Sequence, residues 1–364
     1  MSQPGDECEV NCMRKETLTP KERWLAVLKR GKPDRVPMDY WGTPEATAKV
    51  MKHLRVSTWD AARERLHIDS PVSVGPEYVG PKPPKGENES GCRHKSVDYG
   101  TGVYEEVVYS PLAKFTSVEE IEAKYTWPSP DWYDYKKIPA AVAAAGERPI
   151  RGGGSEPFLA YKSLRGQEQA FMDLVLNPKI VHYCLDKLFD LAYENTRRIY
   201  EAVPGKVMIT YVAEDMGGQE DLMLSPAQIR EFLLPRMKRI MDLAHEAGAY
   251  VFHHNDGAVR KIIPDMIELG IDVLNPIQWR CRGMEREGLK RDFGDMVIFH
   301  GGVDNQYTLP FGTVDEVRGE VADNLRILGA GGGYILAPCH NIQAVSPPEN
   351  VVAMYETGYE GGWT

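Results

Sequence analysis

The stretch from Ala249 to Leu274, AYVFHHNDGAVRKIIPDMIELGIDVL, carries a complete strand–loop–helix–strand unit in one run of sequence. Its β-branched and aromatic residues at 249–253 predict a strand, and the apolar periodicity of 258–269 predicts a helix. A short polar loop at 254–257 joins the two, and residues 271–274 predict the next strand. Because the helix returns the chain so that the second strand can run beside the first, the stretch predicts a parallel sheet.

Units of the same kind lie on both sides of this stretch. Further strands are predicted at 207–212, 296–299 and 334–337, and helices at 225–248, 284–293, 313–328 and 347–358. The helix at 225–248 begins with Ser-Pro, which suits a capped first turn. Five consecutive units are hard to place on one open sheet without a reversal, whereas a closed barrel accommodates them. We therefore expect an α/β fold, a (β/α)8 TIM barrel.

The first half of the chain has a weaker pattern. Strands are predicted there at 35–40, at 68–74, and at either 149–151 or 158–161. Residues 75–135 are rich in Pro, Gly and Tyr and are expected to form an insertion with hairpin character. Residues 1–18 are expected to be a flexible N-terminal tail, and 19–364 to form the single barrel domain, since no repeat or low-complexity linker divides them.

Composition narrows the function classes. The chain has 364 residues, 42% of them hydrophobic and 26% charged, which suits a globular protein with a large core. A net charge of −10 argues against nucleic-acid binding, which would need a basic surface. There is no apolar run long enough to span a membrane and no apolar leader at the start. Six irregularly spaced cysteines do not form a disulfide framework, so we expect a cytoplasmic protein that acts on a small molecule.

Polar residues follow five successive predicted strands. In a barrel of this type, the loops after the strands open on one face and collect the catalytic groups. The residues at these strand ends are Glu214, Asp215, Gln219, His254, Asp256, Gln278, His300, Asp304, Cys339, His340 and Asn341. Solvated loops collect polar residues anyway, but five consecutive strand ends predict the active site.

His254 and Asp256 are the sharpest pair in this set. An imidazole and a carboxylate two residues apart at a strand end can bind one metal ion or form an acid–base couple. His340 could supply a further nitrogen ligand, and Glu214 or Asp215 could complete the set. A hydrogen-bonded polar rim without a metal remains the alternative.

For three neighbouring features, a structural role is set beside a functional one. Cys339 could be a thiolate ligand or a nucleophile, but a small apolar packing role is favoured. If strand alternation continues to His253, its ring faces away from that of His254 and is structural. The glycine run of 151–155 could present backbone N–H groups to an anion, and a simple turn explains it equally well.

Several segments, in order along the chain, resemble the uroporphyrinogen decarboxylase superfamily. They are Thr19-Pro-Lys-Glu-Arg-Trp24, Asp34-Arg-Val-Pro37, Ile271-Asp-Val-Leu-Asn-Pro-Ile-Gln278, Gly301-Gly-Val-Asp304 and Pro347-Pro-Glu-Asn350. The resemblance implies a (β/α)8 barrel, in agreement with the strand–helix alternation. That superfamily contains true decarboxylases and corrinoid-dependent methyltransferases.

The resemblance to the decarboxylase branch is incomplete. True decarboxylases carry arginines shortly after the first strand, whereas the matching stretch here, 38–44, has none. The substrate-clamping aspartate expected after the second strand is also missing, and Pro76, beside Glu77, falls near its place. A multiply carboxylated tetrapyrrole needs positive partners, so heme-pathway decarboxylation is disfavoured.

The methyltransferase branch holds zinc through a His-x-Cys motif and a second Cys after the last strand. The resemblance places His254 on that histidine, Asp256 on the first cysteine and His340 on the second. A His/Asp/His set is harder than a thiolate set, which favours an O- or N-methylated substrate over a thiol. The resemblance implies zinc as the metal and a corrinoid supplied by a partner protein.

If the protein is such a methyltransferase, polar and aromatic residues near the strand ends are expected to contact the substrate. Residues expected to position or enclose the substrate are Tyr40, Trp41, Glu77, Tyr78, Asp215, Gln219, Gln278, Asp304, Cys339 and Asn341. Two other interpretations stay open, a decarboxylase or lyase acting on a small acid and a non-catalytic binder of a tetrapyrrole or corrinoid. The sequence also leaves a homodimer open.

Overall fold

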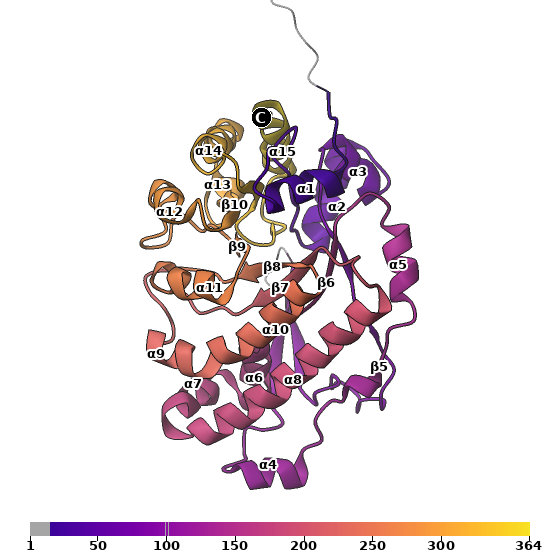
Figure 1. Cartoon of the computed structure of the whole chain (residues 1–364), viewed down its shortest axis with the longest axis vertical. Helices are drawn as coiled ribbons and strands as arrows, with labels where there is room; N and C mark the ends of the chain where they lie inside the picture. The colour runs from indigo at the N-terminus through magenta and orange to yellow at the C-terminus, as the bar shows by residue number, and fades with distance from the viewer. Residues whose placement is uncertain (1–14, 99, 101) are drawn as a thin grey trace, which may run out of the picture.

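A curled parallel sheet forms the centre of the computed structural model, which describes residues 15–98, 100 and 102–364 (Figure 1). Within these residues the sheet has seven strands in the order β1-β6-β7-β8-β9-β10-β11, and each pairs in parallel with its neighbours. The strands are β1 (Val72–Val74), β6 (Ile150–Ser155), β7 (Ile209–Ala213), β8 (Tyr250–His254), β9 (Val273–Asn275), β10 (Ile298–Val303) and β11 (Tyr334–Pro338). The prediction of an α/β fold with a parallel sheet is confirmed.

The backbone around Met38 connects the two edges of this sheet. The N–H of Leu336 in β11 donates to the carbonyl of Pro37 at 2.9 Å, and the N–H of Asp39 donates back to Leu336 at 2.9 Å. On the other side, the N–H of Asp69 donates to the carbonyl of Met38 at 2.7 Å. This segment therefore lies between the last strand and the residues that lead into β1, which gives the fold its TIM-barrel-like form.

Helices follow the strands and surround the sheet (Figure 1). They are α1 (Pro20–Leu28), α2 (Pro44–Leu54), α3 (Trp59–Arg65), α4 (Val118–Lys124), α5 (Ile138–Ala144), α6 (Pro157–Arg165), α7 (Gln167–Leu176), α8 (Pro178–Ala202), α9 (Pro226–Gln228), α10 (Leu234–Glu246), α11 (Ile263–Leu269), α12 (Arg286–Phe293), α13 (Thr308–Phe311), α14 (Val314–Ile327) and α15 (Pro348–Gly361). Single turns of other helix types lie at η1 (Pro130–Trp132), η2 (Ile229–Leu233) and η3 (Arg260–Ile262). No helix in the described part of the chain is long and apolar enough to cross a membrane.

Two strand predictions need correction. The alternative strand at 158–161 is wrong, because Pro157 starts α6 and those residues form its first turns. The strand predicted at 296–299 continues as β10 to Val303, which places His300 inside the sheet instead of in a loop. Its glycines Gly301 and Gly302 have positive φ angles of 111° and 92°, and both keep their pairing with β11.

Helix α1 closes the amino-terminal end of the barrel. Its residues Trp24, Val27 and Leu28 are buried against side chains that belong to the first half of several strands. These strand residues include Ile209, Phe252, Val273, Ile298 and Ile335. Because the interior is filled from this side, the open face of the barrel is the one at the carboxyl ends of its strands.

A buried ion-pair network holds α1 in place. Arg23 donates to Asp34 at 2.7 Å and to Asp69 at 2.6 Å, and Arg35 donates to Asp69 at 2.8 Å. Glu16 accepts from Arg23 at 2.9 Å. Glu16, which belongs to the tail predicted at 1–18, is thus held by this network, and residues 1–14 of that predicted tail lie outside the described residues.

The segment 75–135 contains antiparallel pairs that do not belong to the main sheet. Strands β3 (Arg93–Asp98) and β4 (Val103–Tyr109) form a hairpin, and β2 (Glu77–Tyr78) pairs with β5 (Tyr133–Asp134). The exposed residues of β4 show that the hairpin packs little of its surface against the barrel.

Candidate active site

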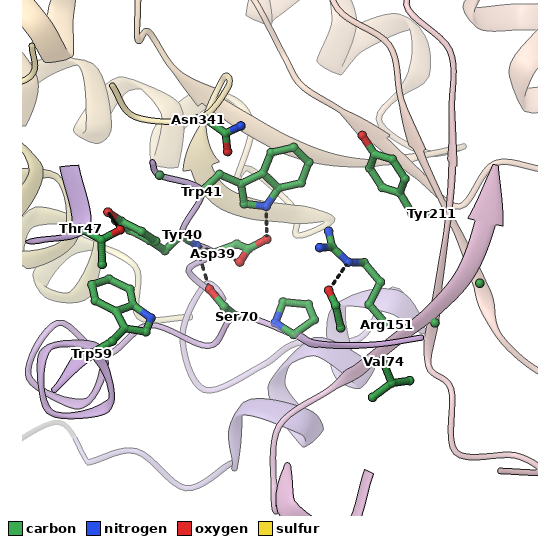
Figure 2. A pocket seen from close by; sticks show the side chains of 15 residues that line it. Asp39, Tyr40, Trp41, Thr47, Trp59, Ser70, Val74, Arg151, Tyr211 and Asn341 are labelled. Atoms are coloured by element: carbon green, nitrogen blue, oxygen red, sulfur yellow. Dashed lines mark hydrogen bonds between the residues drawn. The ribbon is translucent and has the colours of Figure 1, made fainter. Parts of the chain in front are cut away.

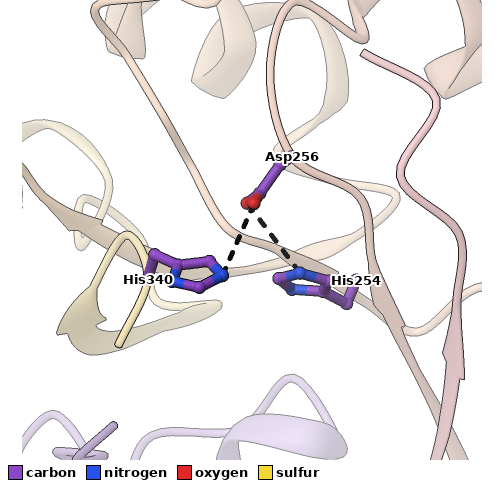
Figure 3. Close-up of side chains that lie close together, drawn as sticks. All are labelled: His254, Asp256 and His340. Atoms are coloured by element: carbon purple, nitrogen blue, oxygen red, sulfur yellow. Dashed lines mark ion pairs between the residues drawn. The ribbon is translucent and has the colours of Figure 1, made fainter. Parts of the chain in front are cut away.

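His254, Asp256 and His340 come together at the carboxyl end of the sheet (Figure 3). Each offers one ligand atom, and these atoms lie within 4.8 Å of one another. His254 ends β8 and its Nε2 lies 3.9 Å from Asp256 Oδ1, while His340, after β11, places Nε2 3.7 Å from Asp256 Oδ2. Two loops far apart in sequence thus meet because both follow strands on the same face.

Negative charge dominates this cluster. Asp215 places Oδ1 3.6 Å from His254 Nε2 and accepts the backbone N–H of Asp256 at 3.4 Å. Burial raises the pKa of Asp256, and Asp215 adds to the rise, while His254 and His340 oppose it. Asp256 Oδ1 is buried and accepts a hydrogen bond from none of the described residues. A buried, unsatisfied carboxylate oxygen facing two imidazoles is the environment that a cation would satisfy.

A chain of hydrogen bonds beneath the cluster determines the protonation of His254. Asp39 Oδ2 can only accept, so His300 donates to it from Nε2 at 3.0 Å. The other nitrogen of His300 then accepts from Asn275 Nδ2 at 2.7 Å, which turns the oxygen of Asn275 toward His254 Nδ1 at 2.5 Å. His254 therefore carries a proton on Nδ1, which leaves Nε2, the nitrogen that faces the carboxylates, as the atom that would bind a metal.

Burial explains why the residues of this hydrogen-bonded chain stay in one protonation state. Burial lowers the pKa of His300 more strongly than the hydrogen bond to Asp39 raises it, so the ring is neutral. Burial would raise the pKa of Asp39, but the hydrogen bond from His300, with contributions from Ser70 and from the charge of Arg151, leaves this pKa below its usual value. An outer hydrogen bond that orients a histidine in this way is typical of metal ligands.

Replacing Asn275 by leucine is expected to weaken metal binding about 10- to 100-fold, because His254 loses the acceptor that orients its ring. The measurement is the metal dissociation constant by competition with a chromophoric chelator. Asn350→Leu is the matched control, since Asn350 is another buried asparagine that donates to backbone, to Leu309 at 3.0 Å. Equal metal affinity in Asn275→Leu and the wild type would contradict this role.

Two cavities lie on either side of the cluster. The smaller, about 370 Å³, is lined by polar residues that include Gln219, Asp256, Gln278 and His340. The larger, about 670 Å³, is lined by Tyr40, Trp41, Trp59, Arg151, Tyr211 and Asn341 among others (Figure 2). His340 lines the smaller cavity and the next residue, Asn341, lines the larger one, so the loop after β11 borders both cavities.

Two aromatic rings that line the larger cavity lie beside His254. The ring centroid of Trp41 lies 5.6 Å from that of His254, and the ring of Tyr211 stacks on His254 at 5.7 Å. The indole nitrogen of Trp41 donates to Asp39 Oδ2 at 2.9 Å, which fixes the ring at the cavity wall. Tyr40 lines the same cavity, but Tyr78 lies on β2 and donates to the carbonyl of Pro81.

Two predicted residues are buried in structural roles. Glu214 accepts the N–H of Phe158 at the start of α6 at 2.8 Å, and burial raises its pKa well above the usual value. It is not one of the three residues whose ligand atoms come together, and its role as a metal ligand stays a prediction. Cys339 is buried and donates to the carbonyl of Ile277 at 3.1 Å, which matches a packing role and removes it from the substrate contacts.

Two further predicted residues are occupied elsewhere. Glu77 is exposed on β2 and pairs with Lys137 at 2.8 Å, outside the lining of both cavities. Asp304 accepts from Arg280 at 2.8 Å and from the N–H of Thr308 at 2.9 Å, so it anchors the start of α13. Both carboxylates have protein partners, and a contact of either with substrate stays a prediction.

Gln278 and Gln219, which both line the smaller cavity, have different hydrogen-bond partners. Gln278 accepts the N–H of Gly257 at 2.6 Å and so holds the loop that carries Asp256. Gln219 accepts from the thiol of Cys281 at 3.4 Å and lines the smaller cavity.

Two charged residues of the site lie on or beside β6 and were missed. Arg151 lines the larger cavity, and Glu156, directly after the strand, has a pKa raised by burial and by nearby Asp215. The predicted strand ended at residue 151 because three glycines followed it, so Glu156 was not considered as a strand-end residue. A strand that continues through these glycines to Ser155 places Glu156 on the same face as His254.

His253 faces away from the cluster, as strand alternation predicts. Its Nδ1 donates to the carbonyl of Val212 at 2.8 Å, and complete burial lowers its pKa to about 4. An unfolded chain binds a proton at this residue below about pH 6.5, whereas the native protein does so only below about pH 4. The unfolded state therefore takes up more protons in this interval, and stability falls as the pH drops through it.

This difference is measurable in His253→Leu. Between about pH 7.5 and about pH 5, the wild type is expected to lose about 2 kcal/mol more unfolding free energy than the variant. Urea unfolding at both pH values provides the comparison, and His94→Leu, at an exposed position of β3, controls for the loss of one histidine. An equal acid loss in wild type and His253→Leu would count against a buried neutral imidazole.

The fold and the cluster define the chain as a TIM-barrel-like α/β protein with a potential metal site at the carboxyl ends of its strands. The model of the uroporphyrinogen decarboxylase (URO-D) family matches residues 97–360, so the chain belongs to this family. The superfamily resemblance is thereby confirmed.

Individual relatives agree with this assignment. A uroporphyrinogen decarboxylase of Psychromonas ingrahamii is 28% identical over 207 residues, which are 55% of this chain and 51% of that protein. One of Neisseria meningitidis is 25% identical over 217 residues, 58% of this chain and 54% of that protein. The match thus spans about half the length of these curated relatives.

A solved structure matches over nearly the whole chain. It is a methyltransferase from Methanosarcina mazei, with a TM-score of 0.69, 21% identity, and coverage of 94% of this chain and 99% of that one. At this identity the likeness shows a common fold.

Proposed function

We propose that this protein is a methyltransferase that moves a methyl group between a small O- or N-methylated substrate and a corrinoid carried by a partner protein. A metal ion held by His254, Asp256 and His340 assists the reaction. The observation that carries the proposal is the convergence of these three ligand atoms within 4.8 Å. The likeness to the Methanosarcina mazei methyltransferase supports the same branch of chemistry.

The donor set suits a metal ion. His254 presents a lone pair on Nε2, Asp256 Oδ1 lacks a hydrogen bond from the described residues, and His340 completes a facing triad. Asp215, 3.6 Å from His254 Nε2, is available as a further ligand. Imidazole and carboxylate ligands fit zinc, our first choice, and their hardness also suits other divalent transition metals.

When bound, the metal supplies a Lewis acid for the heteroatom that loses the methyl group. The protein's own residues do the rest of the work. Trp41 and Tyr211 form an apolar wall beside His254, which orients the substrate and limits water. Glu156, whose pKa is raised by burial, can keep a proton near the cluster for the heteroatom after the carbon–heteroatom bond breaks.

Decarboxylation of a multiply carboxylated tetrapyrrole fits less well. The stretch 38–44 forms part of the larger cavity and contains no arginine. Arg151 is the arginine that lines this cavity, and a single guanidinium neutralises one carboxylate.

The test uses purified protein, cob(I)alamin and a panel of methoxyaromatic and methylamine donors. Formation of methylcobalamin, followed by absorbance, supports the proposal, and its absence across the panel contradicts it. Release of carbon dioxide from small acids without methyl transfer would replace the proposal with a lyase activity. Tight corrinoid binding without turnover, unchanged by His254→Ala, would replace it with a non-catalytic carrier.

A further inference from the structure

Arg151 projects from β6 into the larger cavity without a carboxylate partner (Figure 2). Its Nε donates to Ser73 Oγ at 2.9 Å, which fixes the guanidinium plane. Within the described part of the chain, no carboxylate oxygen lies within 4.0 Å of Arg151, and its two terminal nitrogens donate to no protein atom. The Nε–Ser73 bond leaves the terminal edge of the guanidinium open toward the cavity.

The nearest candidate anion in the cavity is already engaged. Asp39 is buried, and its Oδ2 accepts from Trp41 and from His300, while its Oδ1 accepts the N–H of Tyr40 at 2.8 Å. Its charge acts on Arg151 at longer range only. In a chain with a net charge of −10, a guanidinium left unpaired inside a cavity is an exception that an incoming anion would resolve.

The backbone beside Arg151 does not offer a competing anion site. The N–H of Gly154 donates to Thr196 Oγ1 at 2.9 Å. The alternative that the glycine run binds an anion through its N–H groups is therefore weaker than binding by the arginine side chain.

Aromatic rings lead from Arg151 to the metal-ligating cluster. The guanidinium carbon of Arg151 lies 5.9 Å from the ring centroid of Trp41 and 5.5 Å from that of Tyr211. The same two rings lie 5.6 Å and 5.7 Å from the ring of His254. A planar ligand along this wall would have one end at the guanidinium and the other toward His254.

We infer that the substrate is a small methoxylated aromatic acid whose carboxylate binds to Arg151 through the two terminal nitrogens. The aromatic ring of the substrate packs along Trp41 and Tyr211, and the methoxy group lies toward His254. The position of the methoxy group rests on the proposed methyl transfer, whereas the carboxylate site rests on Arg151 alone.

Binding can be measured without any methyl transfer. The probes are 4-methoxybenzoate and its uncharged analogue 4-methoxybenzyl alcohol, followed by calorimetry and by quenching of the tryptophan fluorescence from the cavity. Arg151→Gln is expected to weaken binding of the acid about 10- to 100-fold and to change that of the alcohol less than about twofold. Arg151→Lys keeps the charge and is expected to give an intermediate affinity.

A matched control separates local binding from overall charge. Arg148→Gln removes one positive charge just before the same strand, at its amino end, and is expected to leave the affinity for the acid unchanged. Circular dichroism and thermal unfolding verify that each variant is folded; if Arg151→Gln is not, the Arg151→Lys comparison carries the test.

The outcomes distinguish the carboxylate site from the methyl transfer. Equal affinity of the wild type for acid and alcohol, or acid binding that survives Arg151→Gln, overturns the inference. Acid binding that depends on Arg151, without methyl transfer to cob(I)alamin, supports the site and contradicts the proposed function. Demethylation of the alcohol by a protein that does not bind the acid supports the proposed methyl transfer and overturns the carboxylate site.

Discussion

Replacing His254 by alanine is expected to lower methyl transfer to cob(I)alamin by about a thousandfold or more, which corresponds to about 4 kcal/mol of barrier. The reason is the position of Nε2, which faces both Asp215 and Asp256. Without this nitrogen, the metal site beside the two carboxylates loses the histidine ligand that Asn275 orients. Metal held at the site is expected to be lost with the activity.

Metal analysis of the purified protein provides the second measurement. The wild type is expected to contain about one equivalent of metal, with zinc as the first candidate, and His254→Ala to contain almost none. His182→Ala is the control, since His182 is an exposed histidine of α8 beside Glu231. A fully active wild type without metal would return His254 and Asp256 to an acid–base role.

Replacing Asp69 by alanine is expected to lower the free energy of unfolding by about 3–5 kcal/mol. Asp69 accepts from Arg23 at 2.6 Å and from Arg35 at 2.8 Å, and all three side chains are almost completely buried. Its removal leaves two buried guanidinium groups with too little negative charge. It also removes the acceptor for the N–H of Met38, in the segment that joins the edges of the sheet.

Equilibrium unfolding in urea checks this value. Asp69→Asn keeps the size and one acceptor and is expected to fall between the wild type and the alanine variant. Asp242→Ala, which breaks an exposed pair with Lys238 in α10, is expected to cost about 0.5 kcal/mol or less. A loss for Asp69→Ala as small as that of Asp242→Ala would contradict the stabilising role of the network.

The two substitutions act at opposite ends of the barrel. The ion-pair network and α1 lie at the amino-terminal end, where barrels are stabilised, and His254 lies at the carboxyl end, where catalytic groups gather. The folded fraction of Asp69→Ala is therefore expected to bind metal with the affinity of the wild type. The unfolding free energy of His254→Ala is expected to stay within about 1 kcal/mol of that of the wild type.

The direction and burial of strand-end side chains explain why residues predicted together for the site have different partners in the structure. Glu214 and Asp215 are adjacent in sequence, yet one accepts an N–H from α6 and the other faces His254. The sequence shows two acidic residues after a strand, and only the packing of α6 against that strand decides which of them remains at the cluster. Asp304 likewise has the right position for a substrate contact but is already bound by Arg280.

The sequence by itself determined the parallel α/β architecture and predicted three strand-end residues that the fold brings together. Strand periodicity and loop position depend on neighbouring residues, so they can be recognised locally, and His254, Asp256 and His340 were found from them. The tertiary structure alone decided the proton on His254, because Asp39, Asn275 and His300 are brought together from three distant segments. It also decided that Arg151 has no carboxylate partner among the described residues, since the identity of a side chain does not reveal which charges the curled sheet places around it.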